Sequence, residues 1–464
     1  MRDVYQPGAR TDASGNAMRV GLDRHSLALL WRSALARDIV FAGSVAVVLG
    51  LIRIGAPSVW VDEAFTARAV RYPFPDYLLE QYHWLYYAML KPWTSLAGTS
   101  EWVLRLPSVL ALMAACGLLV VLAYKLFDRW VALVGGVLLA TSPFLVLWSQ
   151  QARSYTLLVV VSLLATLLLI RALDRGSRAA WLSYGVVFSA VIAVQPVSAL
   201  VVVPAHAVLV FQRRERLVPH ALLAVIAIVA LALPWMTVVS VWSQEFWLAP
   251  PTAKDAAKAV LNISGAAGLG IPLAVVGLVV LRRAGKTDLA VWLGTWAFAP
   301  FLTAAIVSSV KPVFLDRYLI AAAPAFALLG AVAVTGVARR LRVALGVAVV
   351  IATSIGLVSW YSHSYGDNWR GENWKRAVAT VSERQGSDEP IVVVPWWAHP
   401  AASYYGARVV GTSTSDSIWV LFWSEEGHEL PLAERRALGF GEHRLVERLQ
   451  FGWRVSAQRW ERGR

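Results

Sequence analysis

The chain has 464 residues, of which 58% are hydrophobic and only 16% charged, with a formal net charge of +14 and a mean hydropathy of +0.56. This composition leaves too much apolar surface for a water-soluble fold and indicates a membrane protein with several spans. The positive charges lie in short clusters between apolar runs, a pattern typical of membrane orientation, so no nucleic-acid partner is expected.

The apolar runs predict the architecture. Residues 1–37 are polar and are expected to form a disordered cytoplasmic segment. A bilayer core needs about 20 apolar residues of helix. About eleven runs in residues 38–360 come near this length, at 38–56, 106–124, 130–148, 155–173, 180–195, 197–212, 219–242, 263–281, 288–310, 317–337 and 341–360. The fifth and sixth are short and divided by Gln195-Pro196, so this pair could instead form one re-entrant element.

The connections between the runs predict the orientation. Alternate connections are short and rich in Lys and Arg, which places them and the amino terminus in the cytoplasm. Two long segments then face outward, the loop of residues 57–105 and the tail of residues 361–464. The loop is rich in aromatic residues, which suits helices that lie in the outer membrane interface.

The tail predicts a small α/β domain outside the membrane. Its pattern favours a helix at 373–384 and strands at 391–394, 408–410, 418–423 and 453–460. An aromatic patch suits core packing, contact with the first outer loop, or stacking on an acceptor sugar, and consists of Trp396, Trp397, Tyr404 and Tyr405. The predicted fold class is therefore mainly α, with about eleven transmembrane helices and a small extracytoplasmic α/β domain.

Charged residues are rare inside the apolar runs and gather at their outer ends. Transporters place ionisable residues near the membrane midplane, so this distribution favours a site at the outer face. Asp62 and Glu63 follow the first run, where a buried carboxylate implies a metal, an ion pair or a catalytic base. Basic residues that could hold a phosphate, or extend to lipid headgroups, lie in outer turns at Arg153, Lys311 and Arg317.

Several stretches, in this order, resemble the GT-C membrane glycosyltransferases, in the branch that uses polyprenyl-phosphate sugars and includes protein O-mannosyltransferases and the aminoarabinose transferase acting on lipid A. The resemblance covers nearly the whole chain. The matching stretches are Trp60-Val-Asp62-Glu63, Tyr82-His83-Trp-Leu-Tyr86-Tyr87, Ser100-Glu101-Trp-Val-Leu-Arg105-Leu-Pro107-Ser108, Ser142-Pro143 with Gln150-Gln-Ala-Arg153-Ser-Tyr155, Phe314-Leu-Asp-Arg317-Tyr318, and Asn373-Trp374-Lys-Arg.

The resemblance implies an inverting transfer of a sugar, with mannose expected, from a polyprenyl-phosphate carrier to a hydroxyl of a glycan, lipid or protein at the outer face of the cytoplasmic membrane. It makes Asp62 the general base, with Glu63 orienting it or balancing charge. The residues expected to bind the donor phosphate are Arg153, Arg317, Lys311 and His83, and those expected to bind substrate are Tyr86, Tyr87 and Tyr155.

One stretch departs from the family pattern. Relatives often read Asp-x-His-Pro-Pro-Leu-Tyr-Tyr, whereas this chain has Glu80-Gln-Tyr-His83-Trp-Leu-Tyr-Tyr. Because the acidic residue stands at another position than in relatives, the binding of a divalent metal stays an open alternative, with Glu80 and His83 as candidate ligands. His83 could instead bind phosphate or hold the loop by a hydrogen bond. Arg105 is expected to pair with Glu101 or a loop carboxylate. The alternatives are a transporter or flippase for a lipid-linked sugar, and a catalytically inactive GT-C scaffold.

Overall fold

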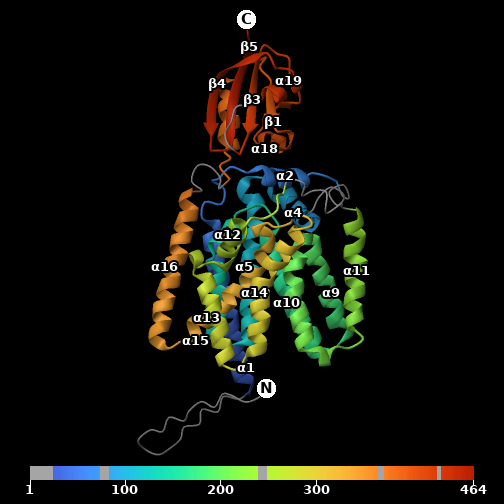
Figure 1. Cartoon of the computed structure of the whole chain (residues 1–464), viewed down its shortest axis with the longest axis vertical. Helices are drawn as coiled ribbons and strands as arrows, with labels where there is room; N and C mark the ends of the chain where they lie inside the picture. Colours follow the sequence, from blue (N-terminus) through green and yellow to red (C-terminus); the bar gives the residue numbers. More distant parts are fainter. Residues whose placement is uncertain (1–23, 74–82, 239–247, 364–369, 426–429, 464) are drawn as a thin grey trace, which may run out of the picture.

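A bundle of helices carries a small sheet domain at one end (Figure 1). The computed structural model describes residues 24–73, 83–238, 248–363, 370–425 and 430–463. Most of the segment expected to be disordered, and Glu80, lie outside these residues. The first helix begins at Arg24, earlier than the expected span, because helix continues through the polar residues that precede the apolar run.

Over their described residues, the expected apolar runs are mainly helical. The helices of the bundle are α1 (Arg24–Leu51), α5 (Glu101–Leu126), α6 (Arg129–Ala140), α7 (Pro143–Ser149), α8 (Tyr155–Arg175), α9 (Arg178–Val194), α10 (Ala199–Gln212), α11 (Ala221–Val238), α13 (Gly270–Arg283), α14 (Thr287–Ser308), α15 (Ala323–Gly336) and α16 (Arg339–His363). Among the described residues, six helical stretches are long and apolar enough to cross a membrane, and a seventh is the pair α6 and α7, bent by 58°. The chain is an integral membrane protein, and the count of eleven spans is not confirmed.

Close contacts between helices depend on small residues. Gly277 of α13 faces the backbone of Leu329 in α15, where an added Cβ would lie 2.2 Å from the carbonyl oxygen. Only glycine permits this approach. The stretch Asp316–Gly336, which contains α15, is the most buried of the candidate spans, whereas α16 lies at the edge with 11% of its apolar window buried (Figure 1).

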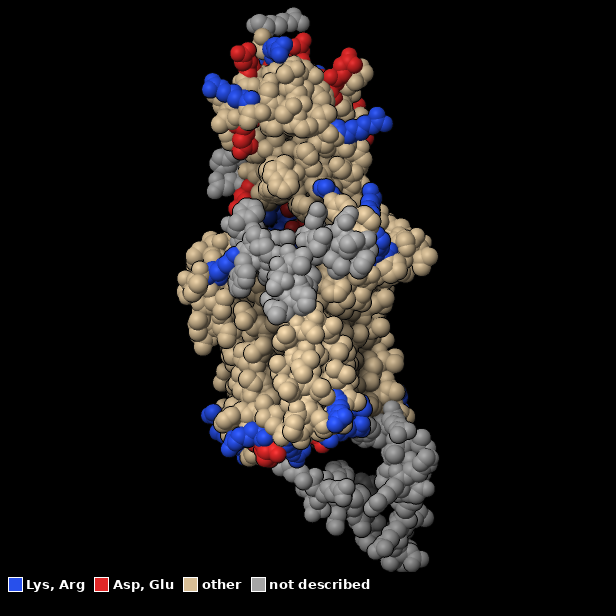
Figure 2. Space-filling view, turned by 90° about the vertical axis from the view of Figure 1, so that its right-hand side faces the viewer, with Lys and Arg blue, Asp and Glu red and all other residues tan. Residues whose placement is uncertain are grey.

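The two ends of the bundle differ in charge. Basic residues gather at the end opposite the sheet domain (Figure 2). There Asp174 forms ion pairs with Lys125, Arg213 and Arg216, at 3.0, 2.9 and 3.2 Å. These are the short basic connections that the sequence places in the cytoplasm.

Short helices cover the other end of the bundle. They are α2 (Val61–Ala69), α4 (Trp84–Ala97), α12 (Ala253–Ser264) and the 3-10 helix η4 (Asp316–Ala322). The first outer loop was expected to lie in the membrane interface, but most residues of α2 are buried, and this helix packs beneath the sheet domain (Figure 1).

The sheet domain has five strands in the order β2-β1-β3-β5-β4. Its elements are α17 (Trp374–Arg384), β1 (Ile391–Val394), α18 (His399–Tyr404), β2 (Val409–Val410), β3 (Ser417–Trp423), α19 (Leu432–Ala437), β4 (His443–Phe451) and β5 (Val455–Arg462). Strand β1 is parallel to β2 and β3, and β5 is antiparallel to β3 and β4. The expected strands are present. Strand β4 was missed because charged residues alternate with its apolar ones along an edge of the sheet.

The core of the sheet domain includes part of the first outer loop. Val59, Val61 and Ala64 are buried in one cluster with Trp374 and Trp419 of the sheet domain. The first outer loop therefore completes this cluster of the domain's core.

The aromatic patch of the tail divides between packing and exposure. Tyr404 donates a hydrogen bond to the carbonyl of Thr99, at 2.6 Å, and so contacts the first outer loop. The ring of Trp397 packs edge-on against Trp423, with centroids 4.6 Å apart. Trp396 remains 74% exposed.

Candidate active site

Asp62 lies in the first turn of α2, close to Arg153 from the turn between α7 and α8. A carboxylate oxygen of Asp62 is 3.8 Å from Nη2 of Arg153, and the side chain of Asp62 is 30% exposed. Nη1 of Arg153 also donates to the backbone carbonyl of Asp62, at 3.4 Å. Figure 2 shows a hollow between the bundle and the sheet domain, with acidic and basic side chains at its floor.

Glu63 points away from Asp62 into a fully buried ion pair with Arg105 of α5. Nε and Nη2 of Arg105 donate to the two carboxylate oxygens, at 2.8 and 2.6 Å. Glu63 also accepts the backbone N–H of Ala152, at 2.8 Å, and caps its own helix through the N–H of Trp60, at 3.4 Å. Glu63 therefore ties α2 to α5 and to the turn that carries Arg153.

Arg105 holds the chain that leads into α2. Besides Glu63 it donates to three backbone carbonyls, those of Ile54 at 2.8 Å, Pro57 at 3.0 Å and Ser58 at 3.2 Å. A buried guanidinium needs such partners to offset its lost hydration. The structural role expected for Arg105 agrees with these contacts, and its partner is the loop carboxylate of Glu63.

Arg153 is buried and has polar partners on several sides. Its Nη1 donates to the hydroxyl of Tyr87, at 3.3 Å, and its Nη2 lies 3.1 Å from Nε2 of His83. The guanidinium also lies over the ring of Tyr155, 5.9 Å from the centroid. Its Nε is buried and has no hydrogen-bond partner among the described residues. A buried donor of this kind fits an anionic ligand.

His83 supports Arg153. Its Nδ1 lies 2.9 Å from the carbonyl of Val194 and 3.0 Å from the hydroxyl of Ser154. A proton on Nδ1 satisfies the carbonyl, so Nε2 accepts from Arg153 and the ring is neutral. Burial, together with the positive charge of Arg153, lowers the pKa of His83 to about 3. Of the two roles left open for His83, this geometry favours holding the loop.

The contacts of His83 also decide whether it can be a metal ligand. Both ring nitrogens of His83 face protein groups, so this residue does not fit a metal ligand. Glu80 lies outside the described residues. Within the part of the chain that the structure describes, no three His, Cys, Asp or Glu side chains cluster as a metal site requires.

Arg317 approaches the same place from η4. Its Nε donates to the hydroxyl of Tyr155, at 3.0 Å, and its guanidinium lies 5.9 Å from the ring centroid of Trp148. Tyr155 therefore contacts both Arg153 and Arg317 and joins them into one positive cluster. Lys311 lies six residues earlier, is partly buried, and stays a prediction as a phosphate ligand.

The tyrosines expected to bind substrate differ in position. Tyr87 touches Arg153, and Tyr155 touches Arg317. Tyr86 is buried behind the turn, where its hydroxyl lies 3.1 Å from that of Ser108, which in turn donates to the carbonyl of Arg153. A direct contact of Tyr86 with substrate stays a prediction.

Two charged residues of the tail were missed. Arg370 stacks over the ring of Trp60, 4.8 Å from the centroid, and Glu372 accepts the backbone N–H of Val61, at 3.1 Å. Both follow the last apolar run on the side of the sheet domain. Both lie in the segment that the sequence predicts as a separate domain, so a position at the outer end of a span, the criterion that selected the other charged residues, does not select them.

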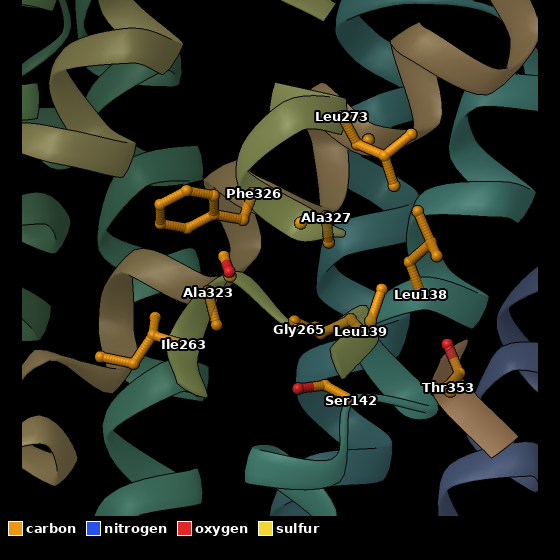
Figure 3. A pocket seen from close by; sticks show the side chains of 14 residues that line it. Leu138, Leu139, Ser142, Ile263, Gly265, Leu273, Ala323, Phe326, Ala327 and Thr353 are labelled. Atoms are coloured by element: carbon orange, nitrogen blue, oxygen red, sulfur yellow. The ribbon is translucent and has the colours of Figure 1, made fainter. Parts of the chain in front are cut away.

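A separate small cavity lies within the bundle. It has a volume of about 20 Å³, room for roughly one water molecule, and is lined mainly by apolar side chains of α6, α13 and α15 (Figure 3). The hydroxyl of Ser142, at the bend between α6 and α7, is buried there without a hydrogen-bond partner among the described residues. The cavity shares no residue with the cluster around Asp62.

The chain is similar to known proteins in sequence and in fold. A family model described as dolichyl-phosphate-mannose-protein mannosyltransferase matches residues 84–240, less than half of the chain. The structure is similar to that of ArnT from Cupriavidus metallidurans in the apo state, with a TM-score of 0.66, 16% identity, and coverage of 94% of this chain and 98% of that one. The chain has the GT-C fold.

Other solved structures share the GT-C fold. ArnT bound to undecaprenyl phosphate matches with a TM-score of 0.64 and 16% identity, over 91% of this chain and 97% of that one. The Archaeoglobus fulgidus oligosaccharyltransferase tethered to an acceptor peptide matches with a TM-score of 0.50 and 13% identity, over 79% of this chain and 63% of that one. No curated protein matches the sequence. The resemblance to GT-C membrane glycosyltransferases is confirmed.

Proposed function

We propose that this chain is an inverting glycosyltransferase that moves a sugar from a polyprenyl-phosphate carrier to an acceptor hydroxyl. The observation that carries the proposal is that the charged groups of Asp62 and Arg153 are 3.8 Å apart, although Asp62 lies in α2 and Arg153 in the turn between α7 and α8. A base and a phosphate-binding cation side by side are what sugar transfer from a lipid phosphate requires.

Asp62 and the two arginines have different tasks in the proposed reaction. The partly exposed carboxylate of Asp62 takes the proton of the acceptor hydroxyl while that oxygen attacks the anomeric carbon. As the new carbon–oxygen bond forms, the bond from the anomeric carbon to the phosphate oxygen breaks, and the phosphate leaves with the electron pair. Arg153 and Arg317 stabilise its added negative charge in a site of low dielectric constant.

The relatives support the class of donor. ArnT has been crystallised with undecaprenyl phosphate, a polyprenyl phosphate. We propose mannose as the sugar, supported by the family model that matches residues 84–240. The acceptor is a hydroxyl of a glycan, lipid or protein. The basic loops at the end of the bundle opposite Asp62 favour a site at the outer face of the cytoplasmic membrane, with a cytoplasmic amino terminus.

The base is tested with Asp62→Asn in lipid nanodiscs, with radiolabelled polyprenyl-phosphate mannose as donor and extracted envelope glycans and lipids as acceptors. We expect the variant to bind donor and to lose transfer. The matched control is Asp255→Asn, because Asp255 caps α12 through Thr252 at the exposed surface of the outer end. Full transfer by Asp62→Asn contradicts the assignment. Movement of donor across sealed vesicles without transfer indicates a flippase instead.

The phosphate ligands are tested by donor binding. Hydrogen bonds to charged groups contribute about 1.5–3 kcal/mol each. We therefore expect Arg153→Ala and Arg317→Ala each to weaken donor binding by roughly 10- to 100-fold. Unchanged donor affinity in both variants removes them from the phosphate site. A polyprenyl-phosphate pentose used in parallel tests mannose as the sugar.

A further inference from the structure

We propose that Glu372, in the sheet domain, is a positioning residue that holds Asp62 in place through the first turn of α2. This inference rests on the proposed function, because it assigns a task to Glu372 in the reaction of Asp62. Glu372 lies 310 positions after Asp62 in the sequence. It is 2% exposed.

The contacts of Glu372 join α2 to the sheet domain. One carboxylate oxygen accepts the backbone N–H of Val61, at 3.1 Å, and the indole N–H of Trp374, at 2.9 Å. The other accepts the indole N–H of Trp423 in β3, at 3.1 Å. Val61 directly precedes Asp62 at the amino end of α2, where backbone N–H groups have no partner within the helix. The carboxylate of Glu372 thus completes the hydrogen bonding of this turn and complements the helix dipole.

Further contacts from the sheet domain hold the residues just before Val61. The hydroxyl of Tyr405 accepts the N–H of Val59, at 2.8 Å. The backbone N–H of Lys375 donates to the hydroxyl of Ser58, at 3.3 Å. The side chains of Val59 and Val61 lie in the core of the sheet domain. The carboxylate of Glu372, the hydroxyl of Tyr405 and the backbone N–H of Lys375 therefore hold the residues that lead to Asp62.

The opposite side of the same turn is held by the bundle. Glu63 accepts hydrogen bonds from Arg105 and from the N–H of Ala152. These two contacts set the position of α2 relative to the turn that carries Arg153. In the sequence, Asp62 stands between Val61, which Glu372 holds, and Glu63, which the bundle holds. A shift of α2 would change the distance between Asp62 and Arg153, and a misplacement of about 1 Å can reduce a reaction rate by roughly 100-fold.

Burial of Glu372 has a cost that the contacts must offset. Burial raises the pKa of Glu372, and the hydrogen bonds from Trp374, Trp423 and Val61 oppose this effect. Val61, Trp374 and Trp423 each donate a hydrogen bond to Glu372. A glutamine in this place would turn its amide N–H groups toward one of these donors, so Glu372→Gln breaks the arrangement with almost no change in volume.

The sheet domain offers a matched control in Glu389. This carboxylate likewise accepts an indole N–H, from Trp419 at 3.0 Å, and a backbone N–H, from Gly386 at 3.0 Å. It also pairs with Arg459. These partners all belong to the sheet domain, and none belongs to α2. Glu389→Gln therefore disturbs a similar network in the same domain without touching the turn of Asp62.

The experiment compares the two glutamine variants and Tyr405→Phe in the full-length protein in nanodiscs. We expect Glu372→Gln to lower kcat by roughly 10- to 100-fold with the donor KM changed by less than about twofold, and Tyr405→Phe to lower kcat less. Glu389→Gln should keep kcat. Hydrogen exchange followed by mass spectrometry should show faster exchange at residues 59–64 in Glu372→Gln but not in Glu389→Gln, and Tyr405→Phe should show it at Val59 alone.

Two results overturn the inference. One is an unchanged kcat in folded Glu372→Gln, and the other is an equal loss of kcat in Glu389→Gln, which would mean that any damage to the sheet domain has this effect. If the wild-type protein transfers no sugar from any donor, the proposed function fails separately. In that case unchanged exchange at residues 59–64 in Glu372→Gln still overturns the inference, and faster exchange at this turn alone supports it.

Discussion

The buried ion pair of Glu63 and Arg105 yields a prediction about stability. Their side chains are 0% and 2% exposed, so solvent does not screen the charges. Removing one partner of a buried pair costs about 3–5 kcal/mol, because the other charge stays buried. Glu63→Ala also leaves the N–H of Ala152 without its acceptor, which adds about 1–3 kcal/mol. We expect Glu63→Ala to destabilise the protein by at least about 3 kcal/mol.

The single cysteine supplies the assay. Cys116 is fully buried in α5, the helix that carries Arg105, and it is the only cysteine of the chain. A maleimide dye that fluoresces on reaction with a thiol reports the unfolding of this helix during heating. The labelling midpoint of Glu63→Ala should fall by several degrees. A Cys116→Ala protein checks that the signal comes from this thiol.

Two further variants sharpen the test. Lys375→Ala removes an exposed ion pair with Glu101, at 3.1 Å, and should cost no more than about 1 kcal/mol. The double variant Glu63→Leu with Arg105→Met removes both buried charges and should recover part of the loss, though three carbonyls lose their donor. The reasoning is refuted if Glu63→Ala keeps the wild-type labelling midpoint. If that variant keeps the midpoint and loses transfer, Glu63 orients Asp62 or balances charge, as the resemblance implies.

Three other outcomes are expected. Tyr155→Phe removes the hydroxyl that accepts from Arg317 and should raise the donor KM by roughly 10-fold, whereas an unchanged KM in donor titrations would contradict this link. In the folded protein, burial lowers the pKa of His83 to about 3, whereas in the unfolded chain this residue binds a proton below pH 6.5. The neutral form of His83 therefore contributes stability above pH 6.5, and this contribution is lost as the pH falls toward 3. When the pH is lowered over this range, the Cys116 labelling midpoint should fall more in wild type than in His83→Asn. Glu389 has its pKa lowered to about 2 because hydrogen bonds from Ser417, Gly386 and Arg459 outweigh its burial. Its contribution should be present above pH 4.5 and lost as the pH falls toward 2, so hydrogen exchange in β3 should depend less on pH in Glu389→Gln than in wild type.

The sequence was sufficient for the class of fold and for the neighbourhood of the site. Long apolar runs require helices in a bilayer, so the positions of the helices followed from hydropathy. Charged residues at the outer ends of those runs must find partners near the membrane surface, and this predicted that Asp62 and Arg153 are close. The bend between α6 and α7 was not visible, because Pro143 at the first position of a helix is compatible with a continued span.

Side-chain partners were harder to predict. The two neighbouring acids have opposite surroundings, with Asp62 partly exposed and Glu63 fully buried, and sequence adjacency cannot show this difference. Glu372 was missed because the tail was treated as a separate domain. Its contact with Val61 joins residues 311 positions apart, and no local pattern records a pairing of that length.

The shared core of the first outer loop and the sheet domain affects how the protein is made. Val59, Val61 and Ala64 leave the ribosome some 300 residues before Trp374 and Trp419, which cover them. Until the sheet domain is made, these apolar side chains lack the cover that it provides. Such long-range contacts form late, after the chain has lost the entropy of closing a long loop. The first turn of α2 therefore acquires its final contacts only when the sheet domain, which comes about 300 residues later in the chain, has folded against it.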